Sequence, residues 1–221
     1  MSLVLRDVRK SFRQGEVEIQ VLKGLQAQWR PGEVVSVVGP SGSGKSTLLS
    51  LMSGLERADS GEVIVDDTHL EKLTEQQLTS FRARHIAIVF QQYHLMNHLT
   101  TVENVMLAME ILRMEQPQVR AESVLKELGL GHRLQHFPSQ LSGGECQRVA
   151  IARALVVKPK VLLADEPSGN LDAKTGEKVM DVFFDVVRKY QITTVLVTHS
   201  EALARRCDRV LHLEDGLLKE F

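Results

Sequence analysis

The stretch from Gly39 to Thr47 constrains the fold of this chain more than any other feature, because it matches the phosphate-binding pattern G-x-x-x-x-G-K-[ST] at every fixed position. The apolar, β-branched residues 34–38 before it predict a buried strand, and residues 47–52 have helix-forming character. A glycine-rich turn between a strand and a helix lets backbone N–H groups surround a phosphate. We therefore expect a nucleotide-binding α/β fold, rather than a Gly/Ser-rich surface loop.

Each residue of this phosphate loop is a candidate nucleotide contact. Lys45 adds a point charge that stabilises a phosphate, and the hydroxyl of Ser46 can ligate Mg²⁺. The full set of candidates is Gly39, Pro40, Ser41, Gly42, Ser43, Gly44, Lys45, Ser46 and Thr47.

Charge and cysteine content argue against several other classes. The 221 residues carry a formal net charge of −1, which removes the usual electrostatic basis for nucleic-acid binding or for a polybasic membrane-surface protein. Cys146 and Cys207 form neither a C-x-x-C pair nor a ligand cluster, so we expect free thiols in a cytosolic chain. Charge appears already at Arg6 and Asp7, and no uncharged apolar run reaches the ~18 residues of a membrane-spanning helix. Any link to a membrane is expected to come through a partner.

Strand patterns dominate the part of the chain before Phe90. Residues 3–5 and 17–22 predict two strands that pair antiparallel across a turn at 13–16. Further strands are expected at 63–65 and 86–90, with a short helix between them that starts at the capping-box pattern of Thr74 and Gln77. The position of Phe12 favours a core residue, and the alternative is a platform on which an adenine ring stacks.

Helical patterns replace strands after Phe90. Thr100 and Glu103 form a second capping box before an apolar run that Pro117 breaks, and a further helix follows. Residues 91–154 therefore predict a mostly helical lobe inserted between strands. Strand–helix alternation then resumes at 161–164, 176–190, 194–197 and 201–206, as in a parallel sheet, and 209–218 predicts a closing hairpin. We expect residues 1–221 to form one domain, with 1–90 and 155–221 as its core.

Polar residues follow three predicted core strands, at the edge where ligands bind in α/β sheets. Asp165 suits a carboxylate that holds Mg²⁺ and Glu166 a base that orients the attacking water, although an ordinary acidic turn is the alternative. His199 could donate a hydrogen bond to a γ-phosphate, but a lone histidine in such a place is more often structural. Gln91 could contact Mg²⁺ or water, or be an ordinary surface residue.

A second glycine-rich helix start lies at residues 141–145. Ser142 is suited to cap a helix expected over 146–155, and Gly143 and Gly144 allow close approach of the backbone to an anion. An ordinary capped helix start explains these residues equally well. Two phosphate-type sites in one chain raise the question of whether both contact the same nucleotide.

Together these motifs resemble the ATP-binding-cassette ATPases. The phosphate loop, Gln91, Leu-Ser-Gly-Gly-Glu at 141–145, Asp165 with Glu166, Ser-Gly-Asn-Leu-Asp at 168–172 and His199 occur in the family's order and approximate spacing over essentially the whole chain. The resemblance implies a P-loop NTPase core with a mainly parallel sheet, an N-terminal antiparallel β subdomain and an inserted α-helical subdomain. It also implies an ATPase that uses ATP and Mg²⁺.

For the site, the resemblance implies a head-to-tail homodimer with ATP between the phosphate loop of one copy and the second glycine-rich helix start of the other. The residues that this assigns to the partner copy's side are Ser142, Gly143, Gly144 and Glu145; those assigned to catalysis are Lys45, Gln91, Glu166 and His199; and those assigned to the metal are Ser46, Gln91 and Asp165. Phe12 falls at the family's adenine-stacking position. Cys146 stands where relatives more often carry glutamine or arginine, which suggests sensitivity to thiol oxidation.

Within the family, the chain looks most like the lipoprotein-releasing and macrolide-exporter group, on residues 90–95, 99–105 and 163–172. The resemblance implies an ATPase on the cytoplasmic face of a bacterial inner membrane, bound to a permease with a large periplasmic part and, through it, a candidate periplasmic adaptor. The permease would dock near Tyr93, Leu95, Met96 and Leu99. Packing of the helical lobe is the alternative role for that apolar stretch.

Three rival functions share parts of this pattern. A cell-division regulator would use the same ATPase without transport, and the sequence barely separates it from a transporter subunit. A DNA-repair or chromosome-structuring ATPase would need a long coiled-coil insertion, and the interval 45–141 has no extended heptads. A small-molecule phosphotransferase would not explain residues 142–144.

Overall fold

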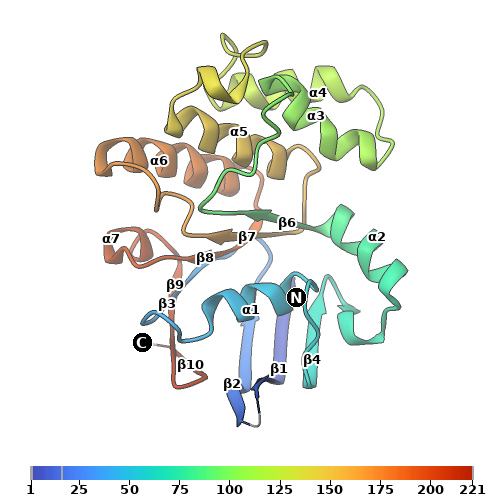
Figure 1. Cartoon of the computed structure of the whole chain (residues 1–221), viewed down its shortest axis with the longest axis vertical. Helices are drawn as coiled ribbons and strands as arrows, with labels where there is room; N and C mark the ends of the chain where they lie inside the picture. The colour runs from blue at the N-terminus through green and yellow to red at the C-terminus, as the bar shows by residue number, and fades with distance from the viewer. Residues whose placement is uncertain (1, 16, 221) are drawn as a thin grey trace.

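The computed structural model describes residues 2–15 and 17–220 and contains two β-sheets with covering helices (Figure 1). The first sheet is antiparallel, with the strand order β2-β1-β4-β5. Its strands are β1 (Leu3–Gln14), β2 (Val17–Trp29), β4 (Ser60–Val65) and β5 (Thr68–His69). The predicted antiparallel pairing of the first two strands is confirmed. Glu16 of the predicted turn lies outside the described residues, as do Met1 and Phe221.

Both strands of this pair are longer than predicted. Phe12 and Ile19 oppose one another near the far end of the ribbon, and both are exposed. The prediction that Phe12 is a core residue is therefore wrong. It fails because this end of the ribbon extends past the region in which the sheet has a partner layer.

The second sheet has the order β10-β9-β3-β8-β7-β6. Its strands are β3 (Val34–Val38), β6 (Ile86–Val89), β7 (Val161–Asp165), β8 (Thr193–Val197), β9 (Arg209–Glu214) and β10 (Leu217–Glu220). Neighbours from β9 to β6 all pair parallel, and only the β9–β10 hairpin is antiparallel. The predicted mainly parallel sheet and closing hairpin are confirmed.

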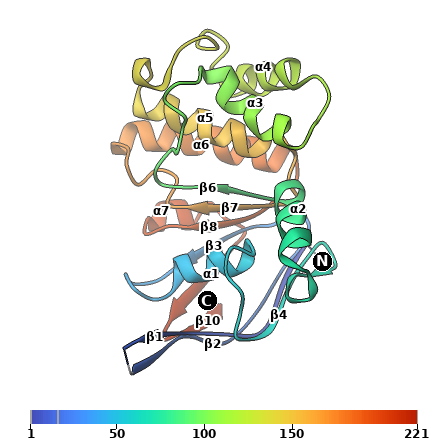
Figure 2. The same ribbon diagram turned by 45° about the vertical axis from the view of Figure 1, so that its right-hand side comes forward.

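Both faces of the parallel strands are covered. Along β7, Leu162 and Ala164 enter one hydrophobic cluster, together with residues of α5 (Gly143–Leu155) and α6 (Ala173–Lys189), while Val161 and Leu163 enter another with α1 (Lys45–Met52). Figures 1 and 2 show α5 and α6 over one face of the sheet and α1 against the other. Burial on both faces explains why these strands read as continuous apolar runs.

Three α-helices and one short 3-10 helix separate β6 from β7, namely α3 (Thr101–Ile111), α4 (Pro117–Glu127), η2 (Pro138–Gln140) and α5. The capping box of Thr100 and Glu103 is present at the start of α3. Pro117 does not end that helix, which stops at Ile111; it is the first residue of α4, where its fixed φ fits and its missing N–H costs nothing. α5 starts at Gly143, earlier than the expected residue 146, because Ser142 caps it.

The remaining helices are α2 (Glu75–His85), η1 (Leu70–Lys72) and α7 (Glu201–Ala204). The predicted capping box at Thr74 and Gln77 begins α2. The short elements β5, η1 and η2 were not expected from the sequence pattern. Across residues 2–15 and 17–220, none of the helices combines the length and the apolar character that crossing a bilayer requires.

Candidate nucleotide-binding site

Strand order brings the predicted site residues to one edge of the parallel sheet. Because β8 lies between β3 and β7, the segments that follow these three strands are neighbours. They surround an open cavity of about 340 Å³. Its wall includes the predicted residues Phe12, Ser41, Gly42, Gly44, Lys45, Ser46, Thr47, Asp165, Glu166 and His199, and also Val21, which sequence reasoning missed.

The phosphate loop is packed tightly against β9. A Cβ atom on Gly39 would lie 2.2 Å from the carbonyl oxygen of Leu213, so only glycine fits there. The loop ends at Gly44, which starts α1 without a side-chain cap. In contrast, the starts of α2, α3, α5 and α6 are each capped by the side chain of a threonine, serine or aspartate. The first amides of α1 therefore remain available to an anion.

Lys45 turns into this loop. Its side chain is almost completely buried, and Nζ donates hydrogen bonds to the carbonyl oxygens of Gly39 (2.9 Å) and Pro40 (2.7 Å). The hydroxyl of Ser43 is buried and has no hydrogen-bond partner within the described part of the chain. A buried ammonium beside uncapped amides is the donor set that a phosphate group requires.

Asp165, the last residue of β7, and Glu166, the next residue, place two carboxyl groups on the same wall. Burial and the charge of Glu166 raise the pKa of Asp165, against the opposing influence of Lys45 and His199. Ionisation of Asp165 is thus disfavoured by the protein alone, and a cation beside it would compensate. The hydroxyl-bearing Ser46 shares the cavity, so the donor set fits Mg²⁺.

Glu166 has a left-handed backbone conformation, with φ of 45°. Its amide donates to the carbonyl of Val197 on β8 (3.0 Å), and this bond anchors the turn. Oε1 of the side chain lies 2.6 Å from Nε2 of His199. Non-glycine residues rarely adopt positive φ, and such strain is concentrated at functional sites. The sequence predicted a contact of His199 with a phosphate. In the structure, His199 contacts the carboxylate of Glu166.

Gln91 does not line the cavity. Its Nε2 donates to Oδ1 of Asn170 (3.1 Å), and Nδ2 of Asn170 donates to the Gln91 carbonyl (3.0 Å). Arg153 of α5 donates to the carbonyls of Tyr93 (2.9 Å) and His94 (2.6 Å), which ties the same segment to the helices. Sequence reasoning missed the role of Asn170 because the two partners are 79 positions apart and neither carries a pairing signal.

Ser142 caps α5 through a reciprocal hydrogen-bonding pair with Glu145. The amide of Ser142 donates to Oε2 of Glu145 (2.8 Å), and Nε of Arg133 donates to Oε1 (2.9 Å). Burial opposes ionisation of Glu145, but the hydrogen bonds from Ser142 and the guanidinium of Arg133 outweigh it and lower the pKa to about 2. The carboxylate is therefore engaged by its own chain, and not directed at a ligand.

The second of the two glycines after Ser142 has a packing role. A Cβ atom on Gly144 would lie 2.6 Å from Cγ2 of Thr175 in α6. The helix α5 packs on the opposite face of the sheet from α1. In a single chain, the residues 142–145 are accordingly absent from the wall of the cavity that the phosphate loop forms.

Cys146 is buried, and its thiol donates to the carbonyl of Pro138 (3.7 Å). Burial, and secondly the charge of Glu145, raise its pKa. Because the thiolate is the reactive form, this environment argues against the suggested sensitivity to oxidation.

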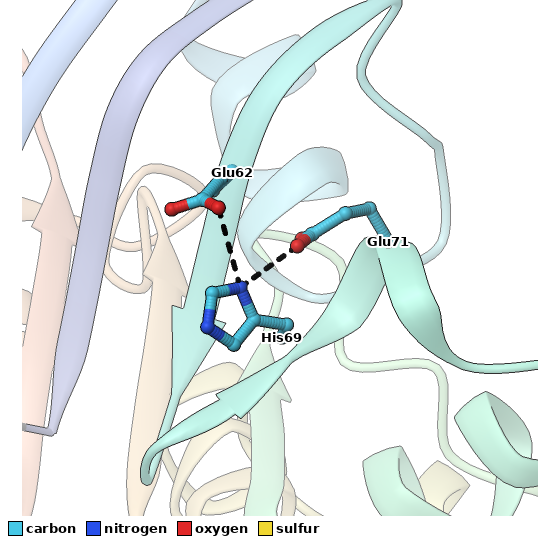
Figure 3. Close-up of side chains that lie close together, drawn as sticks. All are labelled: Glu62, His69 and Glu71. Atoms are coloured by element: carbon cyan, nitrogen blue, oxygen red, sulfur yellow. Dashed lines mark hydrogen bonds and ion pairs between the residues drawn. The ribbon is translucent and has the colours of Figure 1, made fainter.

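A histidine-bridged carboxylate group lies apart from these features, on the antiparallel sheet (Figure 3). Nδ1 of His69 is 2.9 Å from Oε1 of Glu71 and 3.6 Å from Oε1 of Glu62. The second oxygen of Glu62 pairs with Arg6 at 3.2 Å. These contacts join β4 to the short elements β5 and η1, which the sequence pattern did not reveal.

The fold and this cavity define a P-loop nucleotide-binding protein: a parallel sheet with an uncapped glycine-rich helix start, a buried lysine and a carboxylate pair at its carboxyl edge. The model of the ABC transporter family matches residues 22–169. The chain belongs to this family, as the ATP-binding component, and ATP hydrolysis is the family's activity.

Curated relatives match over nearly the full chain. The lipoprotein-releasing system ATP-binding protein LolD of Bacteroides fragilis is 45% identical, with 96% of this chain and 97% of the relative covered. The uncharacterized ABC transporter ATP-binding protein YbbA of Escherichia coli K12 is 46% identical, with 96% and 94% covered. Among solved structures, the cassette MJ0796 in a dimeric post-hydrolysis state bound to ADP and Pi has a TM-score of 0.89 at 40% identity, covering 99% of this chain and 97% of that one. The predicted fold class is thereby confirmed.

Proposed function

We propose that two copies of this chain close around ATP and that hydrolysis reopens them, which drives a bacterial inner-membrane permease in lipoprotein release. One observation carries the first half of this proposal. The uncapped start of α1 and the glycine-rich start of α5 lie on helices that cover opposite faces of one sheet. A second copy, placed head to tail, supplies the missing side of the nucleotide. The dimeric structures of the MJ0796 cassette support this arrangement.

In this assembly the predicted residues bind the phosphates, hold the metal ion or act on the attacking water. The loop amides and Lys45 stabilise phosphate charge, and Ser46 and Asp165 of the cavity wall are candidate ligands of Mg²⁺. Gln91 is the third candidate ligand; it lies outside that wall in the single chain and would have to move toward it to reach the metal. When bound, the metal neutralises negative charge on the phosphates. Glu166 accepts the proton of the attacking water, and His199 holds that carboxylate and contacts the γ-phosphate.

Two further groups contact the nucleotide in this assembly, one at the adenine ring and one from the partner copy. The ring of Phe12, 43% exposed at the cavity wall, provides an adenine-stacking surface. Backbone groups of Ser142, Gly143 and Gly144 of the second copy approach the phosphates. Glu145 contributes by fixing the helix start and makes no direct contact, since its carboxylate is already engaged.

The names of the lipoprotein-releasing relatives support the second half of the proposal. The permease docks beside a surface cavity of about 470 Å³ whose wall includes Tyr93 and Leu95. Met96 is exposed next to it, and Leu99 is half-buried. A helix of a partner with an apolar face fits such a surface. The chain then lies at the cytoplasmic face of the inner membrane, and any periplasmic adaptor is reached through the permease.

We further propose that residues 1–221 act as one domain, in which 1–90 and 155–221 form the core and 91–154 form the lobe that moves. The hydrogen bonds of Gln91 to Asn170 and of Arg153 to the Tyr93 carbonyl support this, because they join the first residues of the lobe to both the core and α5. Movement at the nucleotide is thereby passed toward the permease.

The test of the ATP-driven dimer is Glu166→Gln. We expect the variant to bind ATP, to form a dimer that persists on size-exclusion chromatography and to hydrolyse ATP at least about 100-fold more slowly. Glu177→Gln, at an exposed position on α6, is the matched control and should behave as the unmodified chain. A Glu166→Gln protein that turns over normally and stays monomeric with ATP contradicts the proposal.

The docking surface is tested separately with Met96→Glu. We expect this variant to keep its basal ATPase activity but to lose the integral membrane protein that co-purifies with the tagged unmodified chain from its own host. Retention of that protein by Met96→Glu would place the permease elsewhere.

A further inference from the structure

A second large cavity lies apart from the nucleotide site. Its volume is about 610 Å³, and its walls are α4, the connection from α5 to β7 and the connection from α6 to β8. It shares no lining residue with the nucleotide cavity. Its size falls within the ~300–1,000 Å³ typical of small-molecule sites.

The floor of this cavity is formed by apolar side chains that pack against the core. Leu155 and Ile192 reach it from the buried core, and Val124 of α4 adds a partly buried aliphatic group. Tyr190 forms one wall, and its hydroxyl donates a 2.7 Å hydrogen bond to Glu127, which holds the ring in place. An apolar body of a ligand would be removed from water here.

All charged residues that line this cavity are basic. Arg120, Lys158 and Lys160 line the cavity, and no acidic residue does. None of the three makes an ion pair with any carboxylate of residues 2–15 and 17–220.

The nearby carboxylates are engaged elsewhere. Glu127 accepts from Lys189 and Tyr190, and Glu122 pairs with Lys126 at 3.7 Å. Three cationic residues therefore line an apolar cavity without an ion-pair partner among the described residues, on a chain whose formal net charge is −1. Charge complementarity selects an anion, and the floor selects one with an apolar body.

We propose that this cavity binds a small organic anion whose carboxylate, sulfonate or phosphate head contacts Arg120, Lys158 and Lys160 and whose acyl or aromatic body covers Val124 and Ile192. Such a ligand would bridge α4 to the connections that enter β7 and β8. The site is independent of the proposed transport function.

The probe for this proposal is 8-anilinonaphthalene-1-sulfonate, an aromatic sulfonate that fluoresces when its ring leaves water. Titration is performed with saturating ADP, so that the nucleotide cavity is occupied. The double variant Lys158→Glu and Lys160→Glu should weaken binding at least about tenfold, which corresponds to ~1.4 kcal/mol. Lys178→Glu, which reverses an exposed charge on α6 outside the cavity, should leave the affinity unchanged.

A second variant separates the cavity from its charges. Ser123→Trp, at an exposed lining position of α4, should abolish binding by filling the space while the three cations remain. Displacement of the probe by dodecanoate would identify acyl anions as the ligand class, and displacement by 1-naphthoate alone would identify aromatic ones. Unchanged affinity in both the charge-reversed and the filled variants, or displacement by neither anion, would overturn the proposal.

Discussion

Nε2 of His199 lies 2.6 Å from Oε1 of Glu166, and the two residues come from the ends of adjacent parallel strands. The imidazole N–H holds the carboxylate that accepts a proton from water in the proposed reaction. Removing the ring should leave Glu166 free to turn away, because its backbone alone does not fix the side chain.

We therefore expect His199→Ala to lower the rate of ATP hydrolysis roughly 10²–10³-fold, in the range known for positioned acid–base groups. ATP binding, measured with a fluorescent analogue, should change little. His132→Ala, at an exposed position, is the control. A His199→Ala enzyme with a hydrolysis rate within twofold of normal would show that the contact has no part in catalysis.

Asn170 should matter through both of its hydrogen bonds to Gln91. Asn170→Asp retains the acceptor for the Gln91 side chain but loses the donor to its carbonyl, and Asn170→Leu loses both. Each hydrogen bond is worth about 1 kcal/mol, so we expect Asn170→Asp to lower the activity about fivefold and Asn170→Leu to lower it further. Steady-state kinetics would measure this, with Gln92→Leu, a change at an exposed neighbouring position, as the control. Equal activities of the two Asn170 variants would rule out a graded contribution of the two hydrogen bonds.

The packing of Gly144 against Thr175 predicts a rescue. Gly144→Ala introduces a Cβ atom 2.6 Å from Cγ2 of Thr175 and should destabilise the chain by about 1–3 kcal/mol. Adding Thr175→Ser removes that methyl group and should restore most of the free energy of unfolding, measured by urea denaturation. If the double variant stays as unstable as the single one, the glycine is required for a reason other than this contact.

Glu145 should make stability depend on pH below neutrality. Its pKa in the folded chain is about 2, against ~4.3 for a free glutamate, so the unfolded chain binds more protons in this interval. The stabilisation is fully present above pH ~4.3 and is lost as the pH falls toward 2, by up to about 3 kcal/mol. Denaturation at pH 6 and pH 3 should show a smaller loss for Glu145→Gln than for the unmodified chain. A loss of equal size in both would contradict the assignment.

Thiol reagents should react slowly with this protein. Burial raises the pKa of Cys146 and raises that of Cys207 to about 12, so little thiolate forms at neutral pH. We expect mass spectrometry to show little labelling of the native chain, full labelling in urea, and ATPase activity that survives the reagent. Rapid labelling of Cys146 with loss of activity would restore the oxidation-sensitive site that its position first suggested.

Local patterns were sufficient to predict most elements of this fold. The capping boxes at Thr74 and Thr100 marked two helix starts correctly, because such motifs satisfy backbone donors within a few residues. The alternation of strands and helices likewise predicted the parallel sheet. The errors lay where a partner layer decides the outcome. Phe12 is exposed because the strand pair extends past the layer that covers the sheet. Pro117 separates two helices as predicted, but it does so as the first residue of the second one, α4.

By itself, the sequence determined which residues can bind a phosphate and a cation. The glycines, Lys45, Asp165 and Glu166 are recognisable because their residue types and their spacing along the chain are enough to indicate this chemistry. Only the tertiary structure decided which of them meet. The strand order brings His199 to Glu166 and Asn170 to Gln91, and it separates the start of α5 from the phosphate loop by the thickness of the sheet. The physical reason is that contacts between distant segments depend on how the layers pack, and no local pattern encodes that packing.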